Sequence, residues 1–350
     1  MDEVDYIIVG QGLAGTILGY TFLKRGKKIK IIDEPSFSSC SRVAAGNYNP
    51  IVFKRLVKSW KADEVIPFAD NFFLEAEKFL RDKIFWKKEV MKIFANENEK
   101  WFWEKKTLED NKYLTPAQNN LIENPKSLVA PFGFGLVKDA GKIYSARFIE
   151  LFRNYFSEKK ILQEEKFNFS KLKRSGGQVE YENSIAKKII FCEGWKALGN
   201  PYFSYLPFKP AKGELLILAI EDFNCEKIIH KNGYLYSIGN KLFVAGSTYE
   251  WKELDDIPTE KGKSAIIEKL KKIIQIPFKI VGHVAGVRPS TKDRRPFIGL
   301  HPAFNEIGIF NGFGTKAVML APYFANQLYN YLEFNSPLDM EVNICRFPLP

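Results

Sequence analysis

The sequence predicts a two-domain α/β protein in which a mostly antiparallel β-sheet domain is inserted into a domain built on a parallel sheet. Its 350 residues, 45% of them hydrophobic, are enough to bury the cores of two domains. A strand, a glycine turn, a helix and a second strand follow one another in residues 4–34. Several short strand-like runs follow in residues 186–250, and they favour an inserted sheet in the middle of the chain.

Residues 4–34 form the most readable unit of the chain. The strand VDYIIVG, the helix GTILGYTFLKRG and the strand KKIKIIDE make a βαβ pattern, which the right-handed crossover rule makes parallel. Gly10, Gly12 and Gly15 spell GQGLAG between the first strand and the helix. Such glycines make a tight turn, let the backbone approach a pyrophosphate and let helix and strand pack closely. The unpaired N–H groups at the helix start favour phosphate, so we expect a Rossmann-type dinucleotide site.

An acidic residue closes the second strand of this unit. Asp33 lies 18 residues beyond Gly15, where it can accept hydrogen bonds from a ribose hydroxyl, and Glu34 has the next best claim. A carboxylate at this position disfavours a cofactor with a ribose 2′-phosphate, and it is compatible with either FAD or NAD. Small residues then lead to Gly46 in SSCSRVAAGNYNP (38–50), so the backbone can pass close to a flat ring system. A plain flexible loop explains the same segment.

The remaining elements follow from hydrophobic spacing. The aromatic-rich residues 85–110 predict a hairpin, with Asn96 and Asn98 at its turn. Helical spacing recurs in four further segments, residues 68–80, 146–159, 260–274 and 318–332. Strands are expected at residues 186–195, 213–220, 233–239, 241–250 and 306–314.

Charge and cysteine content narrow the function classes. A net charge of +11 is compatible with nucleic acid, an anionic membrane or a phosphate-rich cofactor, but the lysine runs alternate with acidic stretches and indicate solvated faces. The four cysteines show no spacing typical of a metal site or a disulfide framework. The acidic N-terminus lacks the features of a signal peptide, and no apolar run approaches the roughly 18 residues of a membrane helix. We therefore expect a cytoplasmic protein without a transmembrane segment.

Four blocks together resemble the D-amino-acid oxidase-like family of FAD-dependent oxidoreductases, near its glycine oxidase branch. These blocks are GQGLAG with Asp33, SRVAAGNYNP (41–50), GVRPSTKDRRPFIGLHP (286–302) and NGFGTKAVMLAP (311–322). The resemblance implies a Rossmann-type FAD-binding domain and an inserted substrate domain. The expected FAD-binding domain comprises residues 1–84, 137–210 and 283–350, and the substrate domain comprises residues 85–136 and 211–282.

The resemblance also assigns roles to single residues. Arg288 would hold the carboxylate of an amino-acid substrate over the flavin, since a guanidinium fork matches a carboxylate. A buried salt bridge between the domains is the alternative for this arginine. Tyr236 and Thr315 complete the expected catalytic set, although Tyr234 and Tyr236 share a strand face and core packing explains them too. Glycine oxidases tend to have a second arginine where Thr315 stands, so a small amino-acid substrate is not implied.

Cofactor contacts follow position by position from the same resemblance. Gly10, Gly12, Leu13, Ala14 and Gly15 would face the pyrophosphate, with Asp33 and Glu34 at the ribose. The remaining expected contacts are Cys40 and Ser41 at a phosphate turn, Ala45, Gly46 and Asn47 along the flavin ring, a strand residue near Phe167 at the adenine, Gly194 after the third strand, Arg288, and Gly312, Phe313, Gly314, Thr315 and Lys316 at the flavin's pyrimidine edge. Gly286 stands where covalently flavinylated sarcosine oxidases carry a cysteine, which implies noncovalent FAD.

The expected reaction is oxidation of the C–N bond of an amino acid or secondary amine by hydride transfer to the flavin. Orientation of the substrate and the flavin itself supply most of the catalysis, so a protein base is optional, and none of the three histidines is assigned a catalytic role. Lys54 and Arg55 could add an anionic contact or be surface charges. Two other functions stay open: a flavoenzyme acting on a modified tRNA wobble base, and an FAD-binding protein without amine turnover.

The expected partners are a small amine or amino-acid substrate and an electron acceptor, oxygen or quinone. We expect neither a nucleic-acid partner nor a metal site, and the sequence leaves the oligomeric state open.

Overall fold

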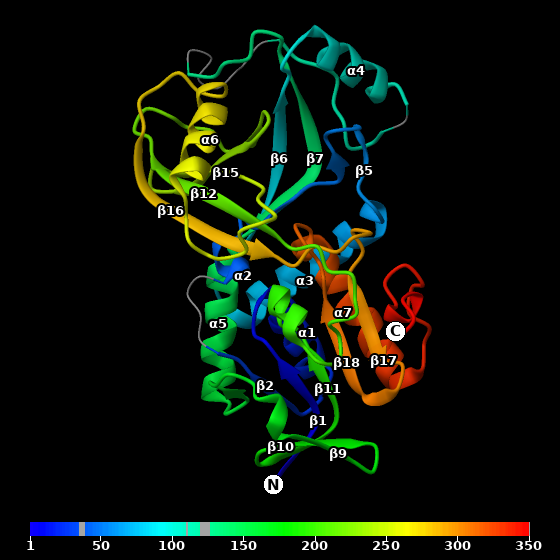
Figure 1. Ribbon diagram of the computed structural model, residues 1–350. Coiled ribbons are helices and arrows are strands. Elements are labelled where there is room, and N and C mark those ends of the chain that lie inside the picture. Colours follow the sequence, from blue (N-terminus) through cyan, green and yellow to red (C-terminus); the bar gives the residue numbers. More distant parts are fainter. Residues whose placement is uncertain (35–38, 110, 120–126, 350) are drawn as a thin grey trace.

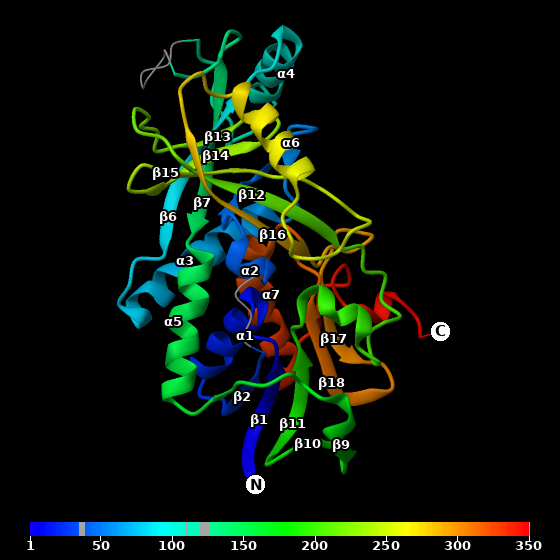
Figure 2. The same cartoon turned by 60° about the vertical axis from the view of Figure 1, so that its left-hand side comes forward.

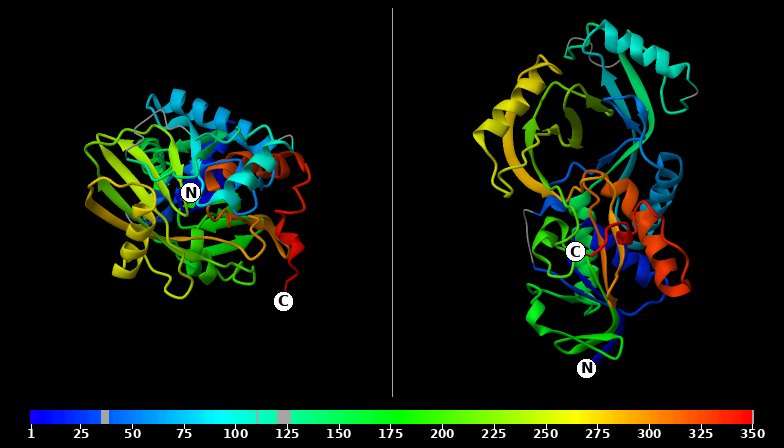
Figure 3. Two further views of the ribbon diagram at one scale, coloured as in Figure 1. Left: turned by 90° about the horizontal axis from the view of Figure 1, so that it is seen from above. Right: turned by 45° about the vertical axis from the view of Figure 1, so that its right-hand side comes forward.

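The structure is a computed structural model that describes residues 1–34, 39–109, 111–119 and 127–349. Two β-sheets lie end to end and give the molecule two lobes (Figures 1 and 3). The N-terminus lies at the free end of the first lobe, whereas the C-terminus lies at its side, close to β17 (Phe297–His301).

The first sheet is mostly parallel, as the βαβ pattern predicts. Strand β1 (Asp2–Val9) lies between β2 (Ile29–Ile32) and β11 (Ser184–Phe191), and both pairings are parallel. Alternate residues of β1 face opposite sides: Ile8 joins one core cluster and Ile7 another, so both faces of the sheet are buried. The rest of this sheet consists of β18 (Phe304–Asn311), β17, β8 (Leu162–Gln163), β10 (Gln178–Tyr181) and β9 (Leu172–Ser175).

Helices cover one face of the first sheet (Figure 2). The helix α1 (Leu13–Leu23) follows β1 directly and packs against α7 (Ala317–Phe334), near the other end of the chain. These two helices thus bring an N-terminal and a C-terminal glycine turn to the same part of the molecule. The other helices of this layer are α3 (Ala62–Leu80) and α5 (Ser145–Glu158).

The second sheet is antiparallel except for one pair of strands. Its order is β16 (Lys279–Arg288), β12 (Ala211–Ala219), β15 (Leu242–Gly246), β14 (Tyr234–Gly239), β13 (Ile228–His230), β6 (Phe85–Ile93), β7 (Phe134–Ile143) and β3 (Asn47–Tyr48). Strands β13 and β6 pair in parallel. A short ribbon, β4 (Ile51–Val52) with β5 (Val57–Lys58), and helix α6 (Glu260–Lys271) also belong to this lobe.

The predicted hairpin in residues 85–110 is wrong. Strand β6 is followed by helix α4 (Glu97–Thr107) instead of a second strand. The Asn96 side chain accepts a hydrogen bond from the Glu99 N–H at 2.9 Å, and the Glu99 carboxylate accepts one from the Ala95 N–H at 2.9 Å. Asn96 therefore caps a helix, because its side chain satisfies an N–H group that has no partner within the first turn.

The mixed α/β class predicted from the sequence is confirmed. The domain boundaries remain a proposal: β7 and β16 cross the predicted boundaries at residues 136/137 and 282/283 while belonging to the second sheet. Strand β16 ends at Arg288, next to the glycine turns of the first lobe (Figure 1). The end of β16 and the glycine turns of the first lobe therefore lie together where the two sheets meet (Figure 1).

Candidate active site

A large cavity lies where the two lobes meet. Its volume is about 1120 Å³, at the upper limit of what small-molecule sites usually offer, so it has room for a large cofactor and a second ligand. Most of the residues predicted from the sequence line it: Gly10, Gly12, Leu13, Ala14, Asp33, Glu34, Cys40, Ser41, Ala45, Gly46, Asn47, Phe167, Gly194, Arg288, Phe313, Gly314, Thr315 and Lys316. Gly15, Gly312 and Tyr236 are not among its lining residues.

The turn before α1 forms one wall of this cavity. Gly10 has φ +99°, a left-handed conformation, and a Cβ there would lie 2.7 Å from the Cys192 carbonyl oxygen. Gly15 supports the turn from behind, since a Cβ on it would overlap the Gly10 carbonyl. Gly12 begins the helix without a side-chain cap, and the Leu13 N–H donates to the Ser41 hydroxyl at 3.0 Å. The helix start therefore offers backbone N–H groups and its positive dipole end to an anion.

Asp33 is held by two groups that sequence reasoning missed. The Gln11 N–H donates to its Oδ1 at 2.7 Å, and Arg153 Nη1 donates to its Oδ2 at 2.6 Å. Arg153 also donates to the Gln11 side-chain oxygen at 2.8 Å. Each carboxylate oxygen keeps a lone pair for a ribose hydroxyl. Glu34 instead forms an exposed ion pair with Lys196 at 3.1 Å.

Short helix α2 (Cys40–Val43) and the loop after it form a second wall. Burial raises the pKa of the Cys40 thiol to about 11, against the opposing charge of Arg288, so this thiol stays protonated at neutral pH. Both polar side-chain atoms of Asn47 are buried without a hydrogen-bond partner although Asn47 lines the cavity. Buried polar groups are rarely left unpaired, so a bound ligand is the partner expected for Asn47.

The glycine turn before α7 forms a third wall. The Gly314 N–H donates to the Pro289 carbonyl at 3.2 Å, which ties this turn to the segment after β16. Helix α7 begins after Lys316 without a side-chain cap. Burial, and then the charges of Arg295 and Arg294, lower the pKa of Lys316. A positive helix end and a lysine therefore meet at this wall of the cavity.

The segment expected at the adenine differs from the prediction in its local structure. Phe167 lies between β8 and a short 3-10 helix (Phe169–Lys171), not on a strand, and its ring stacks on Tyr181 with the centroids 4.5 Å apart. Gly194 follows β11, and its carbonyl accepts a hydrogen bond from Asn311 at 2.8 Å. Its neighbour Glu193 lines the cavity, and burial raises the pKa of that carboxyl to about 7 although Asn200 donates to it.

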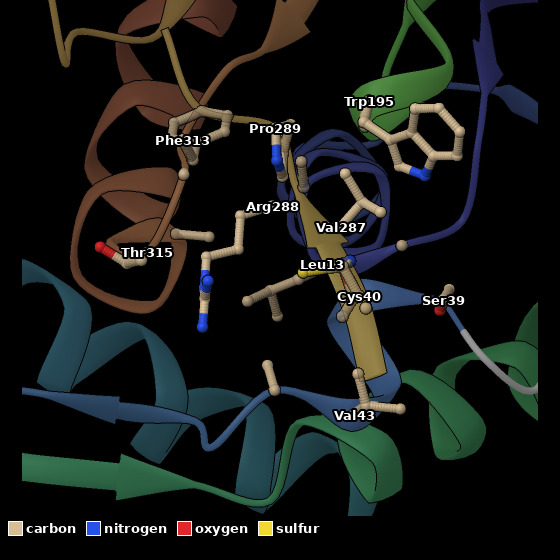
Figure 4. A pocket seen from close by; sticks show the side chains of 18 of the residues that line it. Leu13, Ser39, Cys40, Val43, Trp195, Val287, Arg288, Pro289, Phe313 and Thr315 are labelled. Carbon is tan, nitrogen blue, oxygen red and sulfur yellow. Dashed lines mark hydrogen bonds between the residues drawn. The ribbon is translucent and has the colours of Figure 1, made fainter. Parts of the chain in front are cut away.

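Arg288 lies at the end of β16, with Thr315 on one side and Leu13 and Cys40 on the other (Figure 4). Its Nη1 donates to the carbonyls of Lys212 and Thr248 at 3.3 and 3.2 Å. The guanidinium carbon lies 4.4 Å from the centre of the Tyr249 ring. Among the residues that the structure describes, no carboxylate is within ion-pair distance of Arg288.

The two candidate tyrosines have different positions. Tyr234 lines the cavity, and burial raises its pKa to about 12. Tyr236 is buried, and its hydroxyl donates to the Ala45 carbonyl at 3.1 Å. Tyr236 therefore supports the Ala45–Asn47 loop from behind, and of these two tyrosines Tyr234 is the one that a ligand in the cavity can touch.

Other side chains considered from the sequence lie away from this chemistry. Lys54 and Arg55 are exposed and do not line the cavity. His283 bonds to Glu214 at 2.8 Å, and His301 accepts from the Ala303 N–H at 3.1 Å, so both are structural residues. The described part of the chain contains no group of three or more His, Cys, Asp or Glu side chains that could hold a metal. None of its helices is long and apolar enough to cross a membrane.

The glycine turn, Asp33 and the second helix start face one cavity, an arrangement typical of Rossmann-type dinucleotide-binding proteins. Comparison with known proteins gives the family. The family model described as "FAD dependent oxidoreductase" (DAO) matches residues 5–330, so the chain belongs to this family. The predicted resemblance and fold class are thereby confirmed, and the cofactor is FAD.

Curated relatives are similar over part of their length. The glycine oxidase of Bacillus subtilis is 30% identical over 118 residues, which are 33% of this chain and 32% of the relative. The glycine oxidase of Pseudomonas aeruginosa is 24% identical over 156 residues, or 43% of each chain. These matches span less than half the length of either relative.

Solved structures match over nearly the whole chain. Glycine oxidase from Geobacillus kaustophilus has a TM-score of 0.81 at 16% identity, covering 100% of this chain and 99% of its own. Iminodiacetate oxidase from Chelativorans has a TM-score of 0.78 at 14% identity, with 98% of each chain covered. At such low identities these similarities establish the fold alone.

Proposed function

We propose that this flavoenzyme oxidises the C–N bond of an amino acid or secondary amine whose carboxylate is bound by Arg288. The observation that carries this proposal is the unpaired guanidinium in the cavity: no described carboxylate neutralises it. Arg288 is half-buried and lines the cavity, so an anionic ligand there can supply the counter-charge that the described residues do not. The glycine oxidases and the iminodiacetate oxidase among the similar proteins bear names of enzymes that act on amino carboxylates.

The surroundings of Arg288 suit it to orienting a substrate. The carbonyls of Lys212 and Thr248 hold Nη1, while the Tyr249 ring lies against the guanidinium. The remaining N–H groups are free to form a two-pronged contact with a carboxylate, which fixes the direction of the carbon beside it. Orientation of this kind can supply much of the rate enhancement, because the reacting atoms are held in near-attack geometry.

FAD, when bound, supplies the acceptor for the hydride from that carbon. The protein's own groups near Arg288 are poor bases. The Cys40 thiol and the Tyr234 hydroxyl have pKa values raised to about 11 and about 12, so both stay protonated at neutral pH. We infer that the substrate amine reacts from its uncharged form and loses its proton to solvent rather than to a side chain.

The residues proposed to hold FAD are those of the three cavity walls. The starts of α1 and α7 would take the pyrophosphate and the flavin's pyrimidine edge, and Asp33 the ribose. Asn47 fits a polar edge of the ring system because its amide has no partner in the protein. We further propose that the cofactor is noncovalent; release of all flavin on denaturation is the expected result.

Anaerobic flavin reduction tests the proposed reaction. The holoenzyme is mixed with glycine, larger amino acids, N-methyl amino acids and total tRNA, and flavin absorbance is followed. Bleaching by an amino carboxylate supports the proposal. Bleaching by tRNA alone would instead favour a wobble-base enzyme, and no bleaching by any of them would favour a protein that binds FAD without amine turnover. Reoxidation with oxygen or a quinone then identifies the electron acceptor.

A further inference from the structure

The cavity that Arg288 lines is also lined by three aromatic side chains, Phe53, His230 and Tyr234, which we call the aromatic pocket. The rings of Phe53 and His230 stack with their centroids 4.2 Å apart and their planes at 22°. The Tyr234 ring meets His230 nearly edge-on, at 5.0 Å and 65°. These residues come from three places, the segment after β4, the end of β13 and the start of β14, and all three line the cavity.

His230 differs from the other histidines of the chain in lacking a partner. Its Nδ1 is buried and makes no hydrogen bond, and within the described residues its Nε2 makes none either. Burial, together with the nearby Lys92 charge, lowers the pKa of His230 to about 3, so the ring is neutral at physiological pH. A neutral imidazole has one donor and one acceptor nitrogen, and here neither is used.

The two nitrogens of His230 are not equivalent. A buried N–H without an acceptor is rarer in proteins than a buried acceptor without a donor, so Nδ1 is better left as a bare lone pair. The proton then lies on Nε2. Only Nδ1 is buried without a partner and His230 lines the cavity, so we infer that Nε2 faces the cavity and offers an N–H donor beside two aromatic rings.

Tyr234 connects this pocket to the anion site. Its ring lies beside that of His230, and it lines the same cavity as Arg288 and Tyr249, whose ring lies against the Arg288 guanidinium. A ligand whose carboxylate is bound by Arg288 can therefore extend across Tyr234 toward His230. Glycine has no side chain to reach His230 and would leave the Nε2 donor without a partner in the ligand.

We propose that the aromatic pocket binds a flat substituent of the substrate that carries an acceptor oxygen, with the His230 Nε2–H as its donor. The substrate class is thus an aromatic amino carboxylate with a ring hydroxyl or carbonyl, not glycine. This inference rests on the proposed function in one respect, namely that Arg288 binds the carboxylate.

Binding of carboxylates that lack an amine tests the pocket without turnover. Isothermal titration of the FAD-loaded enzyme compares acetate, phenylacetate and para-hydroxyphenylacetate. We expect phenylacetate to bind more tightly than acetate, and para-hydroxyphenylacetate to bind about tenfold more tightly than phenylacetate. His230→Phe should still bind phenylacetate more tightly than acetate, but it should no longer prefer para-hydroxyphenylacetate over phenylacetate. His230→Gln retains a hydrogen-bond donor and should keep part of that preference.

The possible outcomes separate this inference from the proposed function. If all three carboxylates bind equally and Arg288→Met weakens each of them, the anion site stands and the aromatic pocket is wrong. If the ring hydroxyl of para-hydroxyphenylacetate adds no affinity in the wild type, or if the added affinity survives in His230→Phe, the proposed role of His230 is wrong. If Arg288→Met leaves acetate binding unchanged, the proposed function is wrong. This conclusion does not depend on the affinities for the two aromatic carboxylates.

Discussion

The guanidinium of Arg288 lies against the backbone of Gly213, so close that a Cβ at residue 213 would overlap its nitrogens. The two residues come from the paired strands β12 and β16. The absence of a side chain at Gly213 is therefore what lets Arg288 occupy its position at the end of β16.

Gly213→Ala should displace Arg288 without removing it. We expect carboxylate affinity to fall at least about tenfold, because small misplacements of an orienting group are costly. FAD content should stay unchanged. The matched control is Gly282→Ala on β16, where the nearest atoms that a Cβ would meet belong to the Ile217 side chain, at 3.1 Å or more. Equal losses in both variants would show a general disturbance of the sheet instead of a displaced arginine.

Arg153→Met should weaken FAD binding through Asp33. Both side chains of this pair are largely buried, with 13% and 18% of their surface exposed. Removing the guanidinium leaves the Asp33 carboxylate with one fewer charge-assisted hydrogen bond, worth about 2 kcal/mol. A fluorescence titration of the apoprotein with FAD measures the loss. Arg153→Lys keeps the charge and should retain part of the affinity; no change in either variant would contradict this role.

Asn47→Leu should separate cofactor binding from stability. The Asn47 amide is buried and unpaired in the protein, so an apolar side chain of similar shape should leave the apoprotein equally stable or stabilise it slightly. FAD affinity should nevertheless fall about tenfold, because a hydrogen-bonded ligand contact is lost. Thermal unfolding of the apoprotein and FAD titration are compared. A destabilised apoprotein with unchanged FAD affinity would mean that Asn47 is a structural residue.

Glu193 should make the apoprotein less stable as pH rises. Its pKa in the folded state is about 7, above the ordinary value of 4.5, so between these values the folded protein binds more protons than the unfolded chain. The contribution of Glu193 to the free energy of unfolding is therefore fully present below pH 4.5. It is lost as the pH rises from 4.5 to about 7, by at most about 3 kcal/mol. Urea unfolding of wild type and Glu193→Gln at acidic and alkaline pH measures it. The difference in the free energy of unfolding between wild type and Glu193→Gln should grow with pH. A difference that does not change with pH would contradict the raised pKa of Glu193.

The features of the fold and the site that the sequence predicts directly are those formed by contacts between residues close in sequence. GQGLAG and Asp33 are readable because a strand, a turn and a helix fix each other within one local unit. Local pattern places Arg288 at the end of a strand-like run, but its role at a substrate carboxylate is implied only by the family resemblance. Arg153 gave no signal, because it meets Asp33 from a helix 120 residues away.

Local patterns also left ambiguities that the fold resolves. Tyr234 and Tyr236 lie on one face of β14, and alternation alone does not tell which end of a strand reaches the cavity. The aromatic residues after β6 are compatible with a strand or a helix. The Asn96 side chain favours the helix because it caps the first turn of α4. The sequence does not distinguish His230 from the other two histidines, because its lack of a hydrogen-bond partner is a property of the fold.

Binding of a carboxylate to Arg288→Met is the most direct test of the account. The FAD-loaded variant is titrated with the best amino carboxylate from the anaerobic panel, next to wild type and Arg295→Met, which removes an arginine that pairs with Glu341 outside the cavity. We predict that Arg288→Met keeps its flavin and loses about 3 kcal/mol of binding free energy, roughly a hundredfold in Kd, while Arg295→Met binds as wild type. Unchanged affinity in Arg288→Met, with flavin retained, would contradict the central claim.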